Sequence, residues 1–447
     1  MLENNRDSIT TYISIIAATL ILLSIFIFAR AIISIGAALI IISYLFSTKK
    51  SSSFLSKHKA FIPLLIAGIL ISINLTYLMI VNHNINLKDI FAFSNPLFIV
   101  LYICALYFFL SKDERYANYL LNVFLCVISV FAIIVTTIFI YKHLHGINFI
   151  VSNLYTNVSG GGYIQSMVGL TFPLSAVIIF IKAIKTESKI SRSILIPVAL
   201  IIIFDDIFVN QGRIGYFIEL SVLFYYSFIF VKKFSYSDGK LNIIKSLLAM
   251  FSSILFILML FGIAYNYSTT FHTRMTVMSK NFYSYVTSDP SIDNSEYLKH
   301  TSTGQRALFY STSIKIFKEY PSVLLFGCGY KEGIKDVTEC SRVLIKDSSK
   351  LENEPYVMQT GVEPHNEFIN YVFKAGIGAS VCFIMFFIML FYEAKNLTYN
   401  NMVFMRLLVI GFVIGCLFEY FISSQMSVTI FATLVAIFLA KPLENKS

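Results

Sequence analysis

The chain has 447 residues, of which 57% are hydrophobic and only 13% are charged, and its formal net charge is +10 at pH 7. About a quarter of the residues of a soluble globular protein are charged, so this composition excludes that class. The 20 Gly and 9 Pro are too few for a collagenous or low-complexity chain. The apolar runs are continuous and do not alternate with polar residues, which favours membrane-spanning helices over the strands of an outer-membrane barrel.

The apolar runs predict an all-α polytopic integral membrane protein with about 12 transmembrane helices. The predicted spans are 9–29, 31–46, 60–82, 92–111, 116–141, 164–183, 193–209, 214–231, 243–265, 367–391, 402–422 and 425–440. We therefore divide the chain into residues 1–265 with helices 1–9, a loop domain at 266–366, and residues 367–447 with helices 10–12 and a tail.

The basic residues predict the orientation of these spans. With a cytoplasmic N-terminus, nineteen Lys and Arg residues fall in the cytoplasmic loops and tails, and the opposite short loops hold four, namely Arg30, Lys88, Lys142 and Arg213. Cytoplasmic loops are the ones enriched in Lys and Arg, so we expect both termini in the cytoplasm of a bacterial inner-membrane protein. The positive charge is thus a signal of topology and gives no reason to expect a nucleic-acid partner.

The long segment 266–366 is expected on the periplasmic side, and its sequence predicts a partly helical loop. Residues 306–320 have the pattern of a helix that ends at Pro321, and the glycine-rich turn Phe326-Gly327-Cys328-Gly329-Tyr330 follows. Cys328 and Cys340 both lie in this loop, twelve residues apart. In an oxidising compartment a disulfide and a pair of free thiols both remain open for them.

Ionisable residues within the predicted spans gather at a similar depth, close to the outer face. Each costs roughly 2.5–3.5 kcal/mol at the centre of a bilayer, so such residues are functional candidates. They predict a polar cavity that opens to the outer leaflet. Buried ion pairs that only lock helices together are the alternative explanation for the same residues: Asp205, Asp206, Glu219, Lys374 and Glu419.

His365 is the strongest single candidate for catalysis. It lies in Glu363-Pro364-His365-Asn366-Glu367, directly before a predicted span, so its imidazole is expected at a helix N-terminus, where a general base and an anionic group are both favoured. We interpret the other histidines as solvated loop side chains: His58, His83, His143, His145, His272 and His300.

Two arginines are expected beside His365 on the outer side. Arg213 opens a span after a short turn, and Arg306 begins the helix of the loop. Arginine binds phosphate through two hydrogen bonds, so this combination suits a phosphate or diphosphate attached to a lipid. The chain has no P-loop, Rossmann, HExxH or GxSxG motif, which leaves nucleotide-driven transport and serine hydrolysis without a sequence signal.

Three local motifs resemble those of the O-antigen ligase and polymerase superfamily. The first is Val209-Asn210-Gln211-Gly212-Arg213; the second runs from Gly304-Gln305-Arg306 through Pro321 to Leu325-Phe326-Gly327-Cys328-Gly329. The third is His365-Asn366 followed by Gly376, with Ala379 where the family has Gly, Thr or Tyr. The layout of spans and the position of the long loop are also similar to those of the family.

The resemblance implies a metal-independent glycosyltransferase without a cofactor, acting at the periplasmic face of the inner membrane. Its donor would be an undecaprenyl-diphosphate-linked O-antigen and its acceptor lipid A-core, within the membrane lipid. By matching positions, His365 and Arg306 are expected to be catalytic and Arg213 and Arg306 to bind the diphosphate. Supporting roles are expected for four further residues: Glu419, Asn366, Lys374 and Asp206.

Two other functions remain open at this point. An O-antigen polymerase would use another lipid-linked repeat unit as the acceptor. A transporter or flippase for lipid-linked sugars also explains twelve spans and a polar cavity, although transporters place their substrate near the middle of the membrane. We favour the ligase.

Overall fold

The computed structural model describes residues 2–27, 30–47, 54–82, 95–147, 161–210, 213–237, 240–241, 302–330, 337–347, 365–419 and 424–440, with scattered residues between 244 and 279. This part of the chain is helical apart from a hairpin of β1 (Tyr236–Ser237) and β2 (Lys240–Leu241). Its main helices are α1 (Leu2–Ile27), α2 (Arg30–Phe46), α3 (Phe54–Lys57), α4 (Phe61–Asn82), α6 (Pro96–Leu110), α7 (Glu114–Leu144), α8 (Gly161–Lys185), α9 (Lys189–Phe204), η2 (Asp205–Asn210), α10 (Arg213–Ser235), α14 (Ser302–Glu319), α15 (Pro321–Phe326), η3 (Gly327–Tyr330), α16 (Val337–Asp347), α18 (Glu367–Glu393), η4 (Ala394–Asn396), α19 (Tyr399–Phe418) and α20 (Gln425–Ala440).

Local sequence signals place several helix ends. The side chain of Asn95 accepts a hydrogen bond from the N–H of Leu97, and Pro96, which has no N–H to satisfy, opens α6. Asp113 caps α7 with a side-chain hydrogen bond of the same kind. Pro321 ends α14, as the sequence predicts, and also opens the short helix α15.

α20 forms the centre of the helix bundle. Every residue from Ser427 to Ala440 is buried, and a helix that is apolar on all sides needs neighbours all round. α1, α2, α6, α7 and α19 supply them. The ring of Phe431 on α20 stacks on Phe412 of α19 with 4.0 Å between the centroids.

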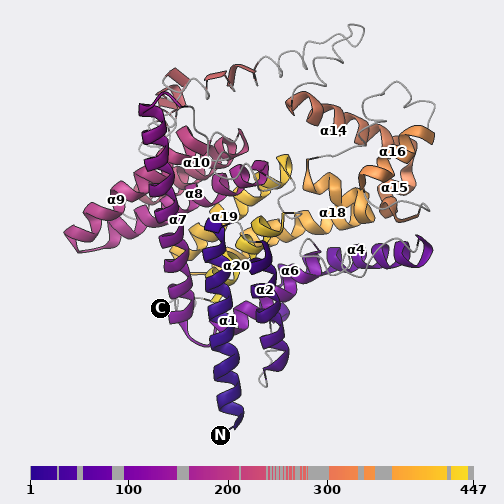
Figure 1. The fold of residues 1–447 in the computed structure, drawn as a ribbon, viewed down its shortest axis with the longest axis horizontal. Helices are drawn as coiled ribbons and strands as arrows, with labels where there is room; N and C mark the ends of the chain where they lie inside the picture. Colours follow the sequence, from indigo (N-terminus) through magenta and orange to yellow (C-terminus); the bar gives the residue numbers. More distant parts are fainter. Residues whose placement is uncertain are drawn as a thin grey trace.

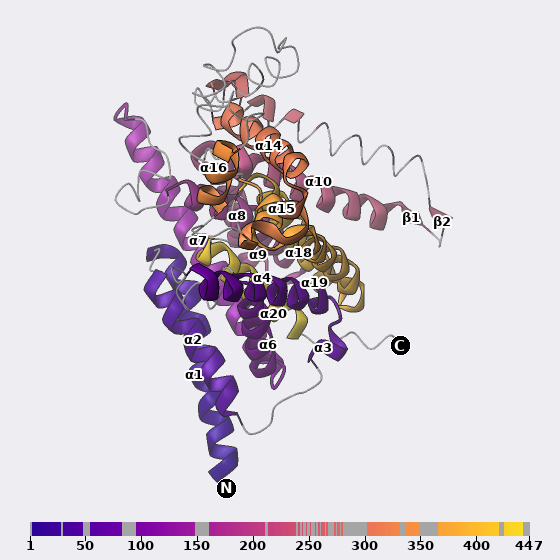
Figure 2. The ribbon, with the colours of Figure 1, turned by 90° about the vertical axis from the view of Figure 1, so that its right-hand side faces the viewer.

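α18 crosses the bundle and carries a group of short helices on its N-terminal half. α15, η3 and α16 contact α18, while α14 contacts α15 and α16. Figures 1 and 2 show these helices together on one side of the molecule, coloured in orange tones. We refer to residues 302–330 and 337–347 as the cap.

Several helices are suited to a membrane. Within the described residues, five segments are long and apolar enough to cross one: Asp7–Ser24, Glu114–Leu144, Val168–Lys185, Glu367–Asn396 and Tyr399–Phe418. Four shorter apolar helices accompany them, which together indicate a multi-pass membrane protein. Helices occupy eleven of the twelve predicted spans, and most of the ninth, 243–265, lies outside the described residues.

Candidate functional site

Three side chains from distant parts of the chain meet at one end of α18 and α19. Arg306 lies near the start of α14, His365 directly precedes the N-cap of α18, and Glu419 directly follows α19. Nη2 of Arg306 lies 2.5 Å from Oε1 of Glu419, and Nδ1 of His365 lies 3.2 Å from Oε2. A single carboxylate therefore holds both residues that the sequence predicts to be catalytic.

This Arg306–Glu419–His365 cluster is only partly covered. The side chains are 20%, 13% and 29% exposed, respectively. The Nε atom of Arg306 is buried and makes no hydrogen bond. Partial burial strengthens the electrostatic interactions in the cluster, while the exposed part of the imidazole and guanidinium leaves them accessible to a ligand.

Glu419 reaches the cluster because α19 stops at Phe418. Glu419 caps the helix in an extended conformation, with φ −148° and ψ 170°, and its N–H still donates to the carbonyl of Gly415 at 2.8 Å. The sequence predicted a span that continued to residue 422, so it placed this carboxylate inside a helix. The earlier end turns Glu419 out of the helical path and toward the loop side chains.

The carbonyl of Leu417 at the end of α19 accepts hydrogen bonds from α14, which carries Arg306, and from the turn that carries His365. The hydroxyl of Tyr310 on α14 donates to it at 3.0 Å, and the side-chain amide of Asn366 donates to it at the same distance. Carbonyls in the last turn of a helix lack partners within the helix, so these bonds satisfy one of them and join three elements. Burial raises the pKa of the Tyr310 hydroxyl, which keeps it protonated as a donor.

His365 has an unusual backbone conformation. Its φ is 42°, in the left-handed region, where a residue other than glycine is disfavoured by roughly 1–2 kcal/mol. The next residue, Asn366, is the N-cap of α18 and its Oδ1 accepts the N–H of Ile369 at 3.1 Å. The hydroxyl of Tyr310 also lies 3.4 Å from the carbonyl oxygen of His365. These bonds hold the turn that presents the imidazole at the helix N-terminus.

The two glycine-containing motifs of the sequence cross each other directly. α18 is interrupted at Ala375 and Gly376, where Gly376 has φ 81°, and Gly327 at the end of α15 has φ 77°. A Cβ atom on Gly376 would lie 2.0 Å from the carbonyl oxygen of Leu325, and one on Gly327 would lie 2.7 Å from the nitrogen of Ala375. Only glycine allows two backbones to approach this closely, so this crossing seats the cap on α18.

Asn74 on α4 forms hydrogen bonds with both backbone segments at this crossing. Its side-chain amide donates to the carbonyl of Phe326 at 3.1 Å and to the carbonyl of Lys374 at 2.5 Å. The break in α18 removes helical partners from carbonyls near it, and Asn74 replaces one of them. α4, the cap and α18 are therefore tied together at one point.

A disulfide closes the cap on itself. It links Cys328 of η3 to Cys340 of α16, which resolves the alternative that the sequence left open. Both cysteines belong to an apolar cluster that includes Phe309 of α14, Leu344 of α16 and Phe373 of α18. The same contacts thus pack the helix that carries Arg306 onto the helix that His365 precedes.

The structure does not bring all predicted site residues together. The backbone of Arg213 opens α10, but its side chain lies outside the described residues. Asp206 lies on the π-helix η2, close enough to the buried Glu219 of α10 for their carboxylates to interact. The ammonium of Lys374 lies 5.9 Å from the ring centre of Tyr371 on its own helix. Asn366, another supporting residue, contacts the same helix end as the cluster.

One histidine differs from its sequence interpretation. His58 was expected to be a solvated loop side chain, and this is wrong: it is 6% exposed. Its Nδ1 lies 2.6 Å from Oε1 of Glu393, the last residue of α18. Its ring packs against Phe54 and Tyr107.

Sequence reasoning missed Asn74 and Tyr310. Asn74 stands in a run of apolar residues in α4, and an amide in such a run is itself a signal, because an unsatisfied polar group is costly there. Tyr310 lies four residues after Arg306, on the same face of α14, which a helical projection would have shown. Neither position matches a motif.

The fold and the cluster define a class: a helical membrane protein in which helix ends and a cap bring an Arg, a Glu and a His together. Comparison with protein families finds a similarity. Residues 198–384, less than half of the chain, match the model of the family described as O-antigen ligase. The matched segment includes Arg306 and His365 and stops before Glu419. None of the curated proteins matches the chain.

Proposed function

We propose that the protein is an O-antigen ligase that transfers polysaccharide from an undecaprenyl-diphosphate carrier to lipid A-core. The observation that carries this proposal is the Arg306–Glu419–His365 cluster, in which one carboxylate orients both an anion-binding group and a base. The match to the O-antigen ligase family supports a lipid-linked O-antigen as the donor.

The cluster is proposed to face the periplasm, with both termini in the cytoplasm. Under the orientation that the basic residues favour, α19 runs outward, so Glu419 at its C-terminal end lies at the outer surface. We propose the same division of the chain as before: transmembrane helices in 1–265, a periplasmic loop domain in 266–366, and further transmembrane helices in 367–447. The cap belongs to the loop domain.

Arg306 and Arg213 are proposed to bind the diphosphate of the donor. The guanidinium of Arg306 has a buried Nε–H without a hydrogen-bond partner, so it can donate to a phosphate oxygen in addition to Glu419. Glu419 keeps the guanidinium oriented before the donor arrives. As the bond to the carrier breaks, negative charge grows on the leaving diphosphate, where a preorganised donor is worth several kcal/mol.

His365 is proposed to take the proton of the acceptor hydroxyl. When Nδ1–H donates to Glu419, Nε2 is the basic nitrogen, and the carboxylate stabilises the imidazolium that forms. The acceptor oxygen forms a bond to the anomeric carbon while the bond from that carbon to the diphosphate oxygen breaks. The proton moves to Nε2 and the diphosphate leaves with the electron pair.

We propose that this chemistry needs no metal ion, because arginines neutralise the leaving diphosphate. Transfer measured in the presence of EDTA tests the proposal, and restoration of activity by added Mg²⁺ or Mn²⁺ would contradict it.

The test of the function is a lipopolysaccharide gel from a deletion strain complemented with Arg306→Ala or His365→Ala. We expect unmodified core in both strains and long polymer on the lipid carrier. Arg342→Ala, an exposed cap arginine, and His145→Ala, an exposed histidine, serve as controls of matched type and should keep the wild-type ladder. Immunoblots of membranes are used to check that all variants are present.

Other gel patterns distinguish the alternatives. Core that carries a single repeat unit would identify a polymerase. A wild-type ladder in both variants would remove Arg306 and His365 from catalysis. For transport, the decisive assay is glycan transfer to lipid A-core by purified protein in detergent. Without compartments, transport cannot produce the joined product, so transfer would exclude a transporter. Failure of transfer by folded protein would favour one.

A further inference from the structure

A groove lies at the other end of α19, away from the Arg306–Glu419–His365 cluster. It has a volume of about 420 Å³ and is lined by α7, α8 and the start of α19, among others by Glu114, Lys182, Lys185, Asn400 and Phe404. α19 has 20 residues, which at 1.5 Å per residue span about 30 Å, the thickness of the hydrocarbon core. The groove and the cluster are therefore about one membrane thickness apart.

Two lysines line this groove, and neither has a carboxylate partner among the described residues. Nζ of Lys182 donates to Oδ1 of Asn122 on α7 at 2.6 Å, and Nζ of Lys185 donates to Oδ1 of Asn400 on α19 at 3.0 Å. An amide oxygen orients an ammonium group but leaves its charge in place. The two lysines are three residues apart, so they share one face of α8 and act on the same space.

The usual structural explanation for lysines at the end of a helix is that they bond its last carbonyls. Here Arg192 at the start of α9 fills that role: its Nε donates to the carbonyl of Ala183 at 3.3 Å and its Nη2 to that of Thr186 at 2.8 Å. The lysines instead extend across to neighbouring helices. Among the lining residues, Lys182 and Lys185 bring two positive charges to the groove, against the single carboxylate of Glu114.

The uncharged part of the lining has both polar and apolar side chains. The apolar ones are Leu121 of α7, Ile181 of α8 and Phe404 of α19, of which Leu121 and Phe404 are buried; the polar ones are Thr186, Thr398, Asn400 and Asn401. A ligand that satisfies both parts has an anionic head and apolar chains. Basic pockets between transmembrane helices on the cytoplasmic side have this composition when they bind anionic lipid headgroups.

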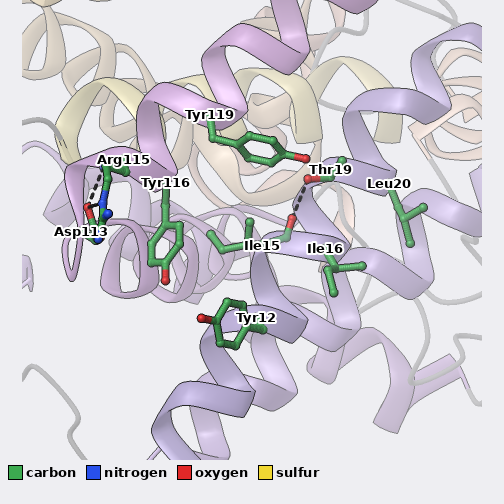
Figure 3. A pocket seen from close by; sticks show the side chains of 9 residues that line it. All are labelled: Tyr12, Ile15, Ile16, Thr19, Leu20, Asp113, Arg115, Tyr116 and Tyr119. Atoms are coloured by element: carbon green, nitrogen blue, oxygen red, sulfur yellow. Dashed lines mark hydrogen bonds and ion pairs between the residues drawn. The ribbon is translucent and has the colours of Figure 1, made fainter.

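A second groove shows why the lysine groove is the better candidate. The α1–α7 groove has a volume of about 560 Å³ and also combines an apolar floor with a cation, Arg115. Figure 3 shows Arg115 turned onto Asp113, with Nη2 2.6 Å from Oδ2. Nε of Arg115 also bonds both carboxylate oxygens, so the charge of that groove is cancelled internally.

We propose that the groove between α7, α8 and α19 binds an anionic phospholipid, with its phosphate between Lys182 and Lys185 and an acyl chain along Leu121, Ile181 and Phe404. The site is separate from the transfer reaction and does not depend on it. Its occupant comes from the inner leaflet of the bilayer, which a basic face of the protein would meet.

The experiment uses the purified full-length protein in detergent micelles, titrated with phosphatidylglycerol or phosphatidylethanolamine, with bound lipid counted by native mass spectrometry. We expect wild-type protein to prefer phosphatidylglycerol. In Lys182→Gln/Lys185→Gln the apparent Kd for phosphatidylglycerol should rise about tenfold or more, because each basic group near an anionic lipid contributes substantially. Lys182→Arg/Lys185→Arg should retain binding.

Lys57→Gln/Lys59→Gln is the matched control, since it removes two lysines that do not line the groove. It should leave the Kd for phosphatidylglycerol unchanged. If the double glutamine variant of the groove does not fold, Lys185→Gln alone, at an exposed side chain, should give a smaller rise in Kd. Wild-type affinity in the glutamine variants, equal binding of the two lipids, or displacement of lipid by millimolar inorganic phosphate would overturn the proposal, the last by identifying free phosphate as the ligand.

Discussion

α18 has a histidine–glutamate pair near each end, and the two pairs differ in their surroundings. His365 and Glu419 meet at its start, with 3.2 Å between Nδ1 and Oε2, while His58 and Glu393 meet at its end, with 2.6 Å between Nδ1 and Oε1. The imidazole is 29% exposed in the first pair and 7% exposed in the second. The histidine is thus accessible in the first pair and packed in the second, while the two glutamates are similarly covered, at 13% and 15%.

The two pairs also differ in the partner of the second carboxylate oxygen of the glutamate. In Glu419 it binds the guanidinium of Arg306, whereas in Glu393 it accepts the backbone N–H of Ala60 at 3.1 Å. The Glu393 pair therefore fastens a turn to the end of α18. A histidine–glutamate contact alone does not indicate catalysis: access and the added cation make the first pair a candidate site.

The largest effect is expected from Glu419→Gln. The amide keeps the size of the side chain but cannot accept from both Arg306 and His365 or stabilise an imidazolium. We expect the rate of glycan transfer by purified protein to fall about 10²–10⁴-fold, the range of a general base. The side chain is 13% exposed and bonds two partners, so the free energy of unfolding should fall as well, by about 1.5–3 kcal/mol for a lost hydrogen bond to a charged group.

Glu393→Gln is the control for this change, because it should lower stability to a similar extent without lowering the rate. A hydrogen bond to a charged group contributes about 1.5–3 kcal/mol, so the free energy of unfolding should fall by an amount in this range, while folded protein keeps its transfer rate. Equal losses of rate in both variants would show that the difference between the pairs has no functional meaning.

The second effect concerns the crossing that seats the cap. Gly376→Ala places a Cβ 2.0 Å from the carbonyl oxygen of Leu325 and forces a left-handed φ of 81° on alanine. We expect the free energy of unfolding to fall by about 3 kcal/mol, combining conformational strain and overpacking. Gly378→Ala is the matched control on the same helix: its nearest neighbour would be Leu70 Cδ1 at an ordinary 3.8 Å. Melting curves of the two proteins in detergent compare them directly.

Much of this region could be predicted from the sequence. Hydropathy placed the helices, Pro321 marked the end of α14, and the motif resemblance selected Arg306, His365, Gly327 and Gly376. These features are local: each depends on a short stretch of chain whose pattern has one structural meaning. The physical role of the two glycines, in contrast, appeared only when the backbones were seen to cross.

Apart from Tyr310, the features that escaped prediction are contacts between distant parts of the chain. Glu419 was expected to support the site, but its ion pair with Arg306 joins residues 113 positions apart, and Asn74 lies 252 residues from Phe326. Hydropathy identifies the helices but not the rotation or depth at which each helix packs against its neighbours. It therefore could not place Asn74 at the crossing. It also extended α19 past Phe418, because a hydropathy window does not see the point where a cap ends the helix.

The third effect tests whether the cap positions Arg306. Cys328→Ser/Cys340→Ser removes the disulfide, and for a loop of this length the loss of stability is expected to be about 2–3 kcal/mol. The rate should also fall, since α16 packs on α14. Cys382→Ser, at a free cysteine of α18, is the control and should leave both unchanged. A variant without the disulfide that melts and reacts like wild type would show that apolar packing alone holds the cap.

The smallest effect is expected from Asn74→Ala, which leaves the carbonyls of Phe326 and Lys374 without their shared donor. An unsatisfied carbonyl costs about 1 kcal/mol when water can partly replace the donor, so the melting temperature should fall slightly. Because the crossing lies below His365, the rate at saturating donor should decrease while KM for the donor stays the same. Thr76→Ala, on the same helix, loses only a bond to Ser72 of α4 and is the control. In a double-mutant cycle the losses of stability from Asn74→Ala and Glu393→Gln should add, because the two sites on α18 are far apart. Measurable coupling would mean that α18 transmits changes along its length, and the two histidine–glutamate pairs would then be parts of one system.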